Sequence, residues 1–164
     1  MIRIGLGTDV HAFAENRDLV IGGVKIDYPR GLLGHSDADV LIHALCDAIL
    51  GAAGLGDIGE HFPDTDPAWK NVDSRMLLEK CSDLIAANGY GIVNIDCIIY
   101  AQEPRISPHK DSIKKNLAHI LNLGLSQINV KATTTEELGF LGRKQGIAAQ
   151  CVVLIQEVSI GREP

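Results

Sequence analysis

Hydrophobic residues along the chain follow two spacings, one typical of strands and one typical of helices. Four segments rich in β-branched residues predict strands, at residues 2–11, 92–101, 128–133 and 147–160. Helical spacing predicts helices at residues 37–53 and 73–88, and a third that opens at Ser107-Pro108 and closes at Gly124. Gly22-Gly23, in the middle of residues 19–26, predicts a small hairpin.

This alternation of strands and helices predicts an α/β (α+β) fold with at least one parallel strand pairing. We expect a single-layer, mixed four-stranded sheet with helices packed on one face, plus the small hairpin. Neither repeats nor a linker interrupt the pattern, so residues 1–164 are expected to form a single domain.

Composition narrows the class of protein further. The formal net charge is −6 and there is no basic run, which disfavours binding to nucleic acid. No apolar run approaches the roughly 20 residues that cross a bilayer, and no signal peptide is visible, so no membrane association and a cytoplasmic location are expected. The four cysteines form no CxxC pair and are expected to be reduced core residues.

A candidate metal site combines a strand with a helix. Asp9 and His11 lie two apart on a predicted strand, so their side chains share one face. Residues 39–52 are apolar nearly all round a helix, except for a narrow strip made by Asp39, His43 and Asp47. Ionisable groups on a buried helix must be paired, hydrogen-bonded or bound to metal. Alone, His43 is more simply a core histidine satisfied by a neighbouring carboxylate, but together with Asp9 and His11 it completes a three-ligand site.

Such a site suits a catalytic divalent ion, Zn²⁺ or alternatively Mn²⁺ or Co²⁺, between which ligand type does not decide. We expect Asp39 or Asp47 to contact the His43 ring and orient it, without itself binding the metal. Ser36 is expected to cap the start of the helix.

Two further segments carry polar groups of less specific meaning. Residues 54–67 form a glycine- and acid-rich loop whose backbone amides could approach a ligand, although such loops are more often simply solvated. Residues 132–136, which include three threonines and Glu136, leave a predicted strand and could hold phosphate oxygens and Mg²⁺. A threonine cap on a short helix would explain the same residues.

Six motifs occur in order from about residue 2 to residue 158. They are Gly7-Thr8-Asp9-Val10-His11; His35-Ser36-Asp37-Ala38-Asp39 with His43-Ala44; Gly56-Asp57-Ile58-Gly59; Phe62-Pro63-Asp64-Thr65-Asp66; Ala101-Gln102-Glu103-Pro104; and Lys131 to Glu136 with Gly139-Phe140 and Gly142-Arg143. In this order they resemble the 2-C-methyl-D-erythritol 2,4-cyclodiphosphate synthase family of the non-mevalonate isoprenoid pathway.

The resemblance implies a reaction without a protein nucleophile. The 2-phosphate of 4-diphosphocytidyl-2-C-methyl-D-erythritol 2-phosphate attacks the β-phosphorus of the diphosphate, and CMP leaves. Catalysis would then rest on positioning and charge neutralisation.

The resemblance also implies residue roles. Asp9, His11 and His43 would hold one divalent metal per subunit, and Glu136 would help to bind Mg²⁺ or Mn²⁺ on the substrate diphosphate. His35 and Thr134 would be the catalytic residues that place the reacting phosphates. Substrate contacts are implied for Asp9, Val10, His11, His35, Ser36, Asp57, Ile58, Gly59, Phe62, Pro63, Asp64, Thr65, Asp66, Ala101, Gln102, Glu103, Pro104, Arg105, Ile106, Ser107, Thr133, Thr134, Thr135, Glu136, Phe140 and Arg143.

Members of this family form homotrimers with active sites between subunits, so the same assembly is expected here. One departure from the family pattern is Gln145, where the family often has Glu, and it bears only on isoprenoid-diphosphate binding in the cavity on the three-fold axis. Two alternatives remain open: a metal-dependent phosphohydrolase, and a non-enzymatic trimer that binds nucleotides or isoprenoid diphosphates.

Overall fold

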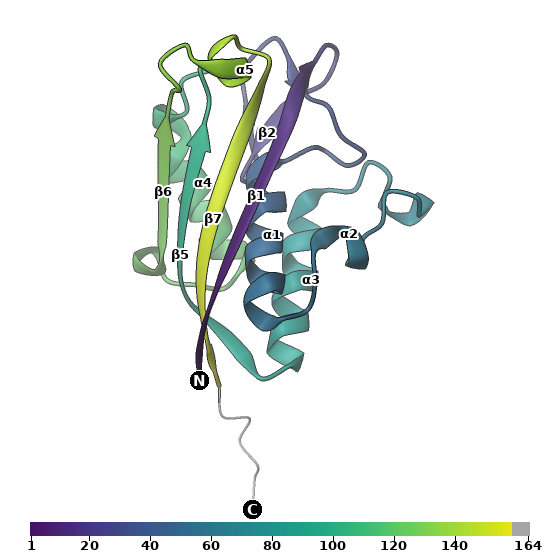
Figure 1. Ribbon diagram of the computed structural model, residues 1–164, viewed down its shortest axis with the longest axis vertical. Helices are drawn as coiled ribbons and strands as arrows, with labels where there is room; N and C mark the ends of the chain where they lie inside the picture. The colour runs from purple at the N-terminus through teal and green to yellow at the C-terminus, as the bar shows by residue number, and fades with distance from the viewer. Residues whose placement is uncertain (159–164) are drawn as a thin grey trace, which may run out of the picture.

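A mixed sheet is the centre of the computed structural model, which describes residues 1–158 (Figure 1). Its strands lie in the order β4-β1-β7-β5-β6, and a separate hairpin pairs β2 with β3. The strands are β1 (Ile2–Ala14), β2 (Leu19–Ile21), β3 (Val24–Ile26), β4 (Gly31–Leu32), β5 (Tyr90–Tyr100), β6 (Ile128–Thr133) and β7 (Gly146–Glu157). The helices are α1 (Val40–Ala53), α2 (Ile58–His61), α3 (Ser74–Ala87), α4 (Lys110–Ile120) and α5 (Gly139–Gly142), with 3-10 turns η1 (Pro67–Trp69), η2 (Ser107–His109) and η3 (Leu125–Gln127).

The predicted mixed sheet and hairpin are confirmed, with one addition. Strands β5 and β6 pair in parallel, whereas β1–β7, β5–β7 and β1–β4 are antiparallel. The sheet has five strands rather than four because β1 continues past His11 to Ala14, where Phe13 and Ala14 pair with the two residues of β4.

Helices α1, α3 and α4 pack on one face of the sheet (Figure 1). Along β1 the even residues are exposed on the opposite face, among them Ile4 at 70 % and Leu6 at 60 %. Odd residues face α1, where Gly5 and Gly7 let the two backbones approach closely. A Cβ on Gly7 would lie 2.0 Å from the Ala44 carbonyl oxygen, so β1 and α1 lie closer together than a side chain at this position would permit.

Helix α1 is buried over most of its circumference, as its apolar pattern predicts. Its N-cap is Asp39 rather than Ser36: the Asp39 carboxylate accepts hydrogen bonds from the backbone N–H groups of Leu41 and Ile42. The same carboxylate accepts N–H bonds from Gly22 at 2.9 Å and Gly23 at 2.6 Å, and so ties the hairpin to the start of α1.

Other predicted element ends shift by a few residues. Ser107 begins the turn η2, without a side-chain cap, and the helix itself runs from Lys110 to Ile120, ending before Gly124. Strand β7 ends at Glu157, and the predicted extension to residues 159–160 lies outside the described residues.

All four cysteines are free thiols in the core, as predicted. Across residues 1–158, no helix combines the length and apolarity that spanning a membrane would require.

Candidate metal centre

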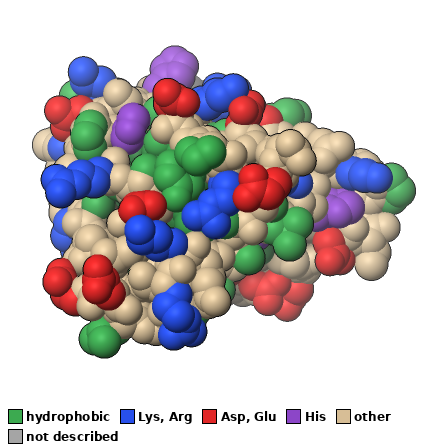
Figure 2. All heavy atoms as spheres, turned by 90° about the horizontal axis from the view of Figure 1, so that it is seen from above, with side chains coloured by type: hydrophobic (Ala, Val, Ile, Leu, Met, Phe, Trp, Pro, Cys, Tyr) green, Lys and Arg blue, Asp and Glu red, His purple; other side chains and the backbone are tan. Residues whose placement is uncertain are grey.

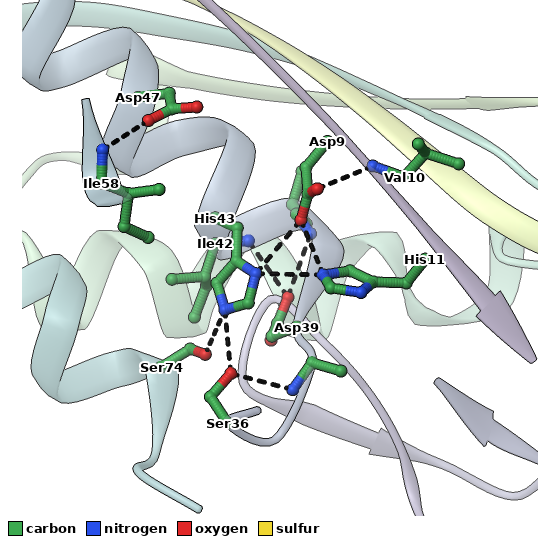
Figure 3. Close-up of polar contacts among 12 residues, drawn as sticks. Asp9, Val10, His11, Ser36, Asp39, Ile42, His43, Asp47, Ile58 and Ser74 are labelled. Carbon is green, nitrogen blue, oxygen red and sulfur yellow. Dashed lines mark hydrogen bonds and ion pairs between the residues drawn. The ribbon is translucent and has the colours of Figure 1, made fainter. Parts of the chain in front are cut away.

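Asp9, His11 and His43 meet at one point between β1 and α1 (Figure 3). Asp9 Oδ2 lies 2.8 Å from His11 Nε2 and 3.1 Å from His43 Nδ1, and the two imidazole nitrogens are 3.1 Å apart. Between 15 and 25 % of each side chain is exposed, so the cluster is partly buried but reachable from solvent. The predicted three-residue cluster is therefore formed.

The other nitrogen of each imidazole is already engaged. His11 Nδ1 lies 2.6 Å from the carbonyl oxygen of Leu33, which can only accept, so Nδ1 carries the proton and donates. His43 Nε2 lies 3.1 Å from Ser36 Oγ and 3.0 Å from Ser74 Oγ. A proton on Nε2 would leave His43, like His11, with a lone pair directed toward the Asp9 carboxylate.

Three electron-pair donors that face one another are stabilised by a proton or a metal cation between them. A tetrahedral ion with bonds of about 2.0–2.1 Å holds its ligand atoms roughly 3.3 Å apart, within about 0.5 Å of each of the three spacings here. The donor set of two imidazoles and one carboxylate also leaves a coordination position for substrate. The residues present therefore fit a divalent metal ion.

The pKa values of the cluster agree with this need for positive charge. Burial alone would raise the pKa of the Asp9 carboxyl, but in the absence of metal, protonated His11 and His43 rings donate to it, which outweighs burial and holds that pKa well below its usual range. Burial alone would lower the pKa of His11, yet the hydrogen bond and charge of Asp9 raise it. A proton on His11 thus competes with a metal ion, and metal binding is expected to weaken as the pH falls.

Neither Asp39 nor Asp47 hydrogen-bonds to the His43 ring, so the prediction that one of them orients it is wrong. Asp39 caps α1, and Asp47 Oδ1 accepts the backbone N–H of Ile58 at 2.8 Å, which fastens α2 to α1 (Figure 3). Full burial raises the pKa of Asp39 to about 6 against the opposing effect of its N–H donors. Ser36 and Ser74 occupy the position that was predicted for a carboxylate.

A cavity of about 390 Å³ adjoins the metal-binding cluster. Predicted substrate residues in its wall are His11, His35, Ser36, Ile58, Gly59, Phe62, Pro63 and Asp64. Asp57 and Asp66 are the N-caps of α2 and η1, and Thr65, directly before Asp66, is exposed. Acids of this loop therefore shape its backbone.

A second cavity, of about 520 Å³, lies between the loop after β5 and the end of β6. Predicted residues in its wall are Ala101, Gln102, Glu103, Arg105, Ile106, Ser107, Thr133 and Thr134. Its wall does not include Pro104, Thr135, Glu136, Phe140 or Arg143. Glu136 accepts a hydrogen bond from Thr134 Oγ1 at 2.8 Å, and Glu137 N–H donates to Gln102 Oε1 at 3.2 Å, which joins the two sides of the cavity. Figure 2 shows acidic and basic side chains interspersed over the end of the molecule that carries α5.

The two cavities are separated by the width of the sheet. Val10 pairs with Ala148, Ala148 with Tyr100, and Tyr100 with Thr133, so three strand spacings lie between β1 and β6 at this level. At roughly 4.8 Å each, this is about 14 Å. The structure therefore does not bring Glu136 or Thr134 to the metal cluster of the same chain.

Sequence reasoning missed Trp69, Val72 and Leu77 in the wall of the first cavity, and Ser74 beside His43. Trp69 lines the first cavity with its ring 5.0 Å from that of Phe62, and the only available signal was that it is the single tryptophan of the chain. Ser74, against His43, gave no signal because a serine at a helix start is ordinarily read as a cap.

Fold and site together define a class: an α/β protein with a two-histidine, one-carboxylate metal-binding centre beside a cavity. The chain belongs to the YgbB family, whose model matches residues 2–156. It is 59 % identical over 157 residues to the 2-C-methyl-D-erythritol 2,4-cyclodiphosphate synthase of Geobacillus sp. (strain WCH70), covering 96 % of this chain and 99 % of that protein.

Solved structures agree with this family. The bifunctional IspDF from Campylobacter jejuni matches with a TM-score of 0.93 and 50 % identity, over 96 % of this chain and 43 % of that one. The CDP complex of IspF from Plasmodium falciparum matches with a TM-score of 0.83 and 39 % identity, over 95 % and 96 % of the two chains.

Proposed function

We propose that this protein cyclises 4-diphosphocytidyl-2-C-methyl-D-erythritol 2-phosphate to 2-C-methyl-D-erythritol 2,4-cyclodiphosphate and releases CMP, as a phosphorus–oxygen lyase of isoprenoid precursor biosynthesis. The observation that carries the proposal is the convergence of Asp9, His11 and His43 in a chain so similar to synthases of this name. The proposal places the activity in a single domain over residues 1–164, and a cytoplasmic location accords with the four free cysteines.

The cavity beside the metal cluster would hold the phosphorylated methylerythritol. A divalent ion on Asp9, His11 and His43, Zn²⁺ in the first instance, supplies Lewis-acid polarisation of a phosphate oxygen. His35 and Ser36 lie in the wall of this cavity, beside His43, where they can donate to phosphate oxygens. The apolar Ile58 and Phe62 close the wall and exclude water from the reacting groups.

The cavity between the loop after β5 and the end of β6 would hold the cytidine diphosphate. A relative of this family has been solved as a CDP complex, which supports a cytidine-linked substrate. Thr133 and Thr134 lie in the cavity wall, with hydroxyls suited to phosphate oxygens, and Arg105 adds a positive charge. Glu136, beside Thr134, is a hard oxygen ligand suited to Mg²⁺ or Mn²⁺ on the diphosphate.

Because about 14 Å separates the two cavities of one chain, we place each active site between two subunits of a homotrimer. The uncovered sheet face supports this assembly. Ile2, Ile4, Leu6, Val10 and Val152 expose between 41 and 70 % of their surface there, a contiguous apolar area of the kind that subunits bury.

A charge on this face is expected to disrupt the trimer. Leu6→Glu should yield a monomer by light scattering and lower turnover by about a hundredfold, since the two halves of the site would no longer be positioned together. Met76→Glu is the control, because Met76 is 50 % exposed but lies on α3, away from the open face. A Leu6→Glu monomer with full activity would contradict the shared site.

Phosphorus NMR of the reaction products tests the function itself. Purified protein with a divalent metal should convert the nucleotide substrate to equal amounts of CMP and a cyclic diphosphate. Free orthophosphate or an opened monophosphate would instead show the phosphohydrolase alternative. Binding of substrate without turnover would show the non-enzymatic alternative.

A further inference from the structure

Ser74 lies in the core between His43 and a carboxylate that the proposed reaction does not use. It is the first residue of α3 and is fully buried. Its Oγ is 3.0 Å from His43 Nε2 and also donates a hydrogen bond to Asp37 Oδ1. A continuous chain therefore runs from Asp37 through Ser74 to the imidazole at the metal cluster.

The carboxylate end fixes the direction of every proton in this chain. An ionised carboxylate only accepts hydrogen bonds, so the Ser74 hydroxyl proton points to Asp37. Ser74 Oγ then presents a lone pair to His43, and Nε2 must carry the proton that it accepts. Ser36 Oγ also lies near Nε2 and accepts the Ala38 N–H, but no contact with a carboxylate fixes its hydroxyl proton within the described chain.

Backbone groups hold Asp37 in place for this role. Its Oδ2 accepts the N–H of Ser74 at 3.1 Å and its Oδ1 accepts the N–H of Asp39 at 3.3 Å. The loop before α1 and the start of α3 are thereby joined at the back of His43. These contacts position the hydrogen-bonded series Asp37–Ser74–His43 without needing a bound metal.

We propose that Asp37 and Ser74 are positioning residues that hold His43 with Nε2 protonated and its Nδ1 lone pair aimed at the metal. The proposal rests on the metal centre of the proposed function and deepens it. Partners of this kind fix the tautomer and ring orientation of a metal-binding histidine, and their loss typically weakens metal affinity by about 10–100-fold.

Metal affinity, measured without substrate, directly tests the role of the hydrogen bonds from Asp37 through Ser74 to His43. Ser74→Ala and Asp37→Asn should each weaken the binding of Zn²⁺, measured by competition with a chelator, by about 10–100-fold. Ser82→Ala, on the same helix but away from His43, should bind as the original protein does. Ser74→Thr keeps the hydroxyl and should restore most of the affinity. Asp37→Asn removes the charge and replaces one accepting oxygen with an NH2 group that can only donate, so it tests the carboxylate separately from the serine.

A proton signal separates positioning from a merely structural role. In the Zn²⁺-loaded protein, the His43 Nε2–H should give a hydrogen-bonded resonance in slow exchange with water, and Ser74→Ala should accelerate that exchange. Urea unfolding shows whether each variant is folded. Folded Ser74→Ala and Asp37→Asn proteins that bind Zn²⁺ within about twofold of the original affinity would overturn the proposal. Absence of Zn²⁺ binding in the unaltered protein would instead overturn the metal centre of the proposed function.

Discussion

Replacing His43 with alanine is expected to lower kcat/KM for cyclisation by roughly a thousandfold or more. Removal of one of three ligands leaves Asp9 and His11 with an incomplete site, and charge stabilisation by a bound metal contributes several kcal/mol to such a reaction. The measurement is steady-state release of CMP, together with the metal content of the purified variant, which should fall far below one ion per chain.

His119→Ala is the matched control for that experiment. His119 is exposed on α4, in another part of the helix layer, and its removal should change neither activity nor metal content. Undiminished cyclisation by the His43→Ala protein would show that the metal cluster plays no part in catalysis.

Replacing Gly7 with alanine is expected to destabilise the protein by about 3 kcal/mol or more. The new Cβ would lie 2.0 Å from the Ala44 carbonyl oxygen and 2.6 Å from the Ala48 backbone nitrogen, so β1 and α1 must separate. Because Asp9 and His11 lie on β1 whereas His43 lies on α1, the same displacement should weaken metal binding.

Gly51 offers the control for this substitution, since it lies on the same helix with nothing within 4 Å of the position of a new Cβ. Gly51→Ala should stabilise the protein by about 0.5–1 kcal/mol, because alanine favours the helix. Urea unfolding at one fixed protein concentration measures both. A Gly7→Ala protein as stable as the original would show that this close approach is not needed.

The metal cluster could be predicted from sequence because each contributing element leaves a strong local pattern. Asp9 and His11 share a strand face, and His43 interrupts a helix that is otherwise apolar nearly all round. Burial on both elements leaves few ways to satisfy their polar groups, so convergence follows from the fold. The mixed sheet and hairpin were predictable for similar reasons.

The surroundings of His43 were not predictable, because they depend on the start of a second helix. Helical spacing grouped Asp39 with His43, but Asp39 precedes the first helical residue and caps it. Ser74 is 31 residues from His43 and reaches it only because α3 packs beside α1. Side-chain direction at a helix end is set by capping geometry, which residue spacing does not encode.

The division of the site into two cavities also depends on long-range pairing. Order along the chain gives no distance between the end of β6 and the strand carrying Asp9 and His11. That distance is set by the strand order, because β7 and β5 both lie between β1 and β6. Sequence motifs alone could not reveal that one chain holds two separated halves.

Anomalous X-ray diffraction at the absorption edge of the bound metal tests the metal centre most directly. Crystals of the purified protein should show one strong peak per chain, about 2.0–2.2 Å from Asp9 Oδ2, His11 Nε2 and His43 Nδ1. Crystals that diffract well in the presence of Zn²⁺ but show no anomalous peak among these three atoms would contradict the account.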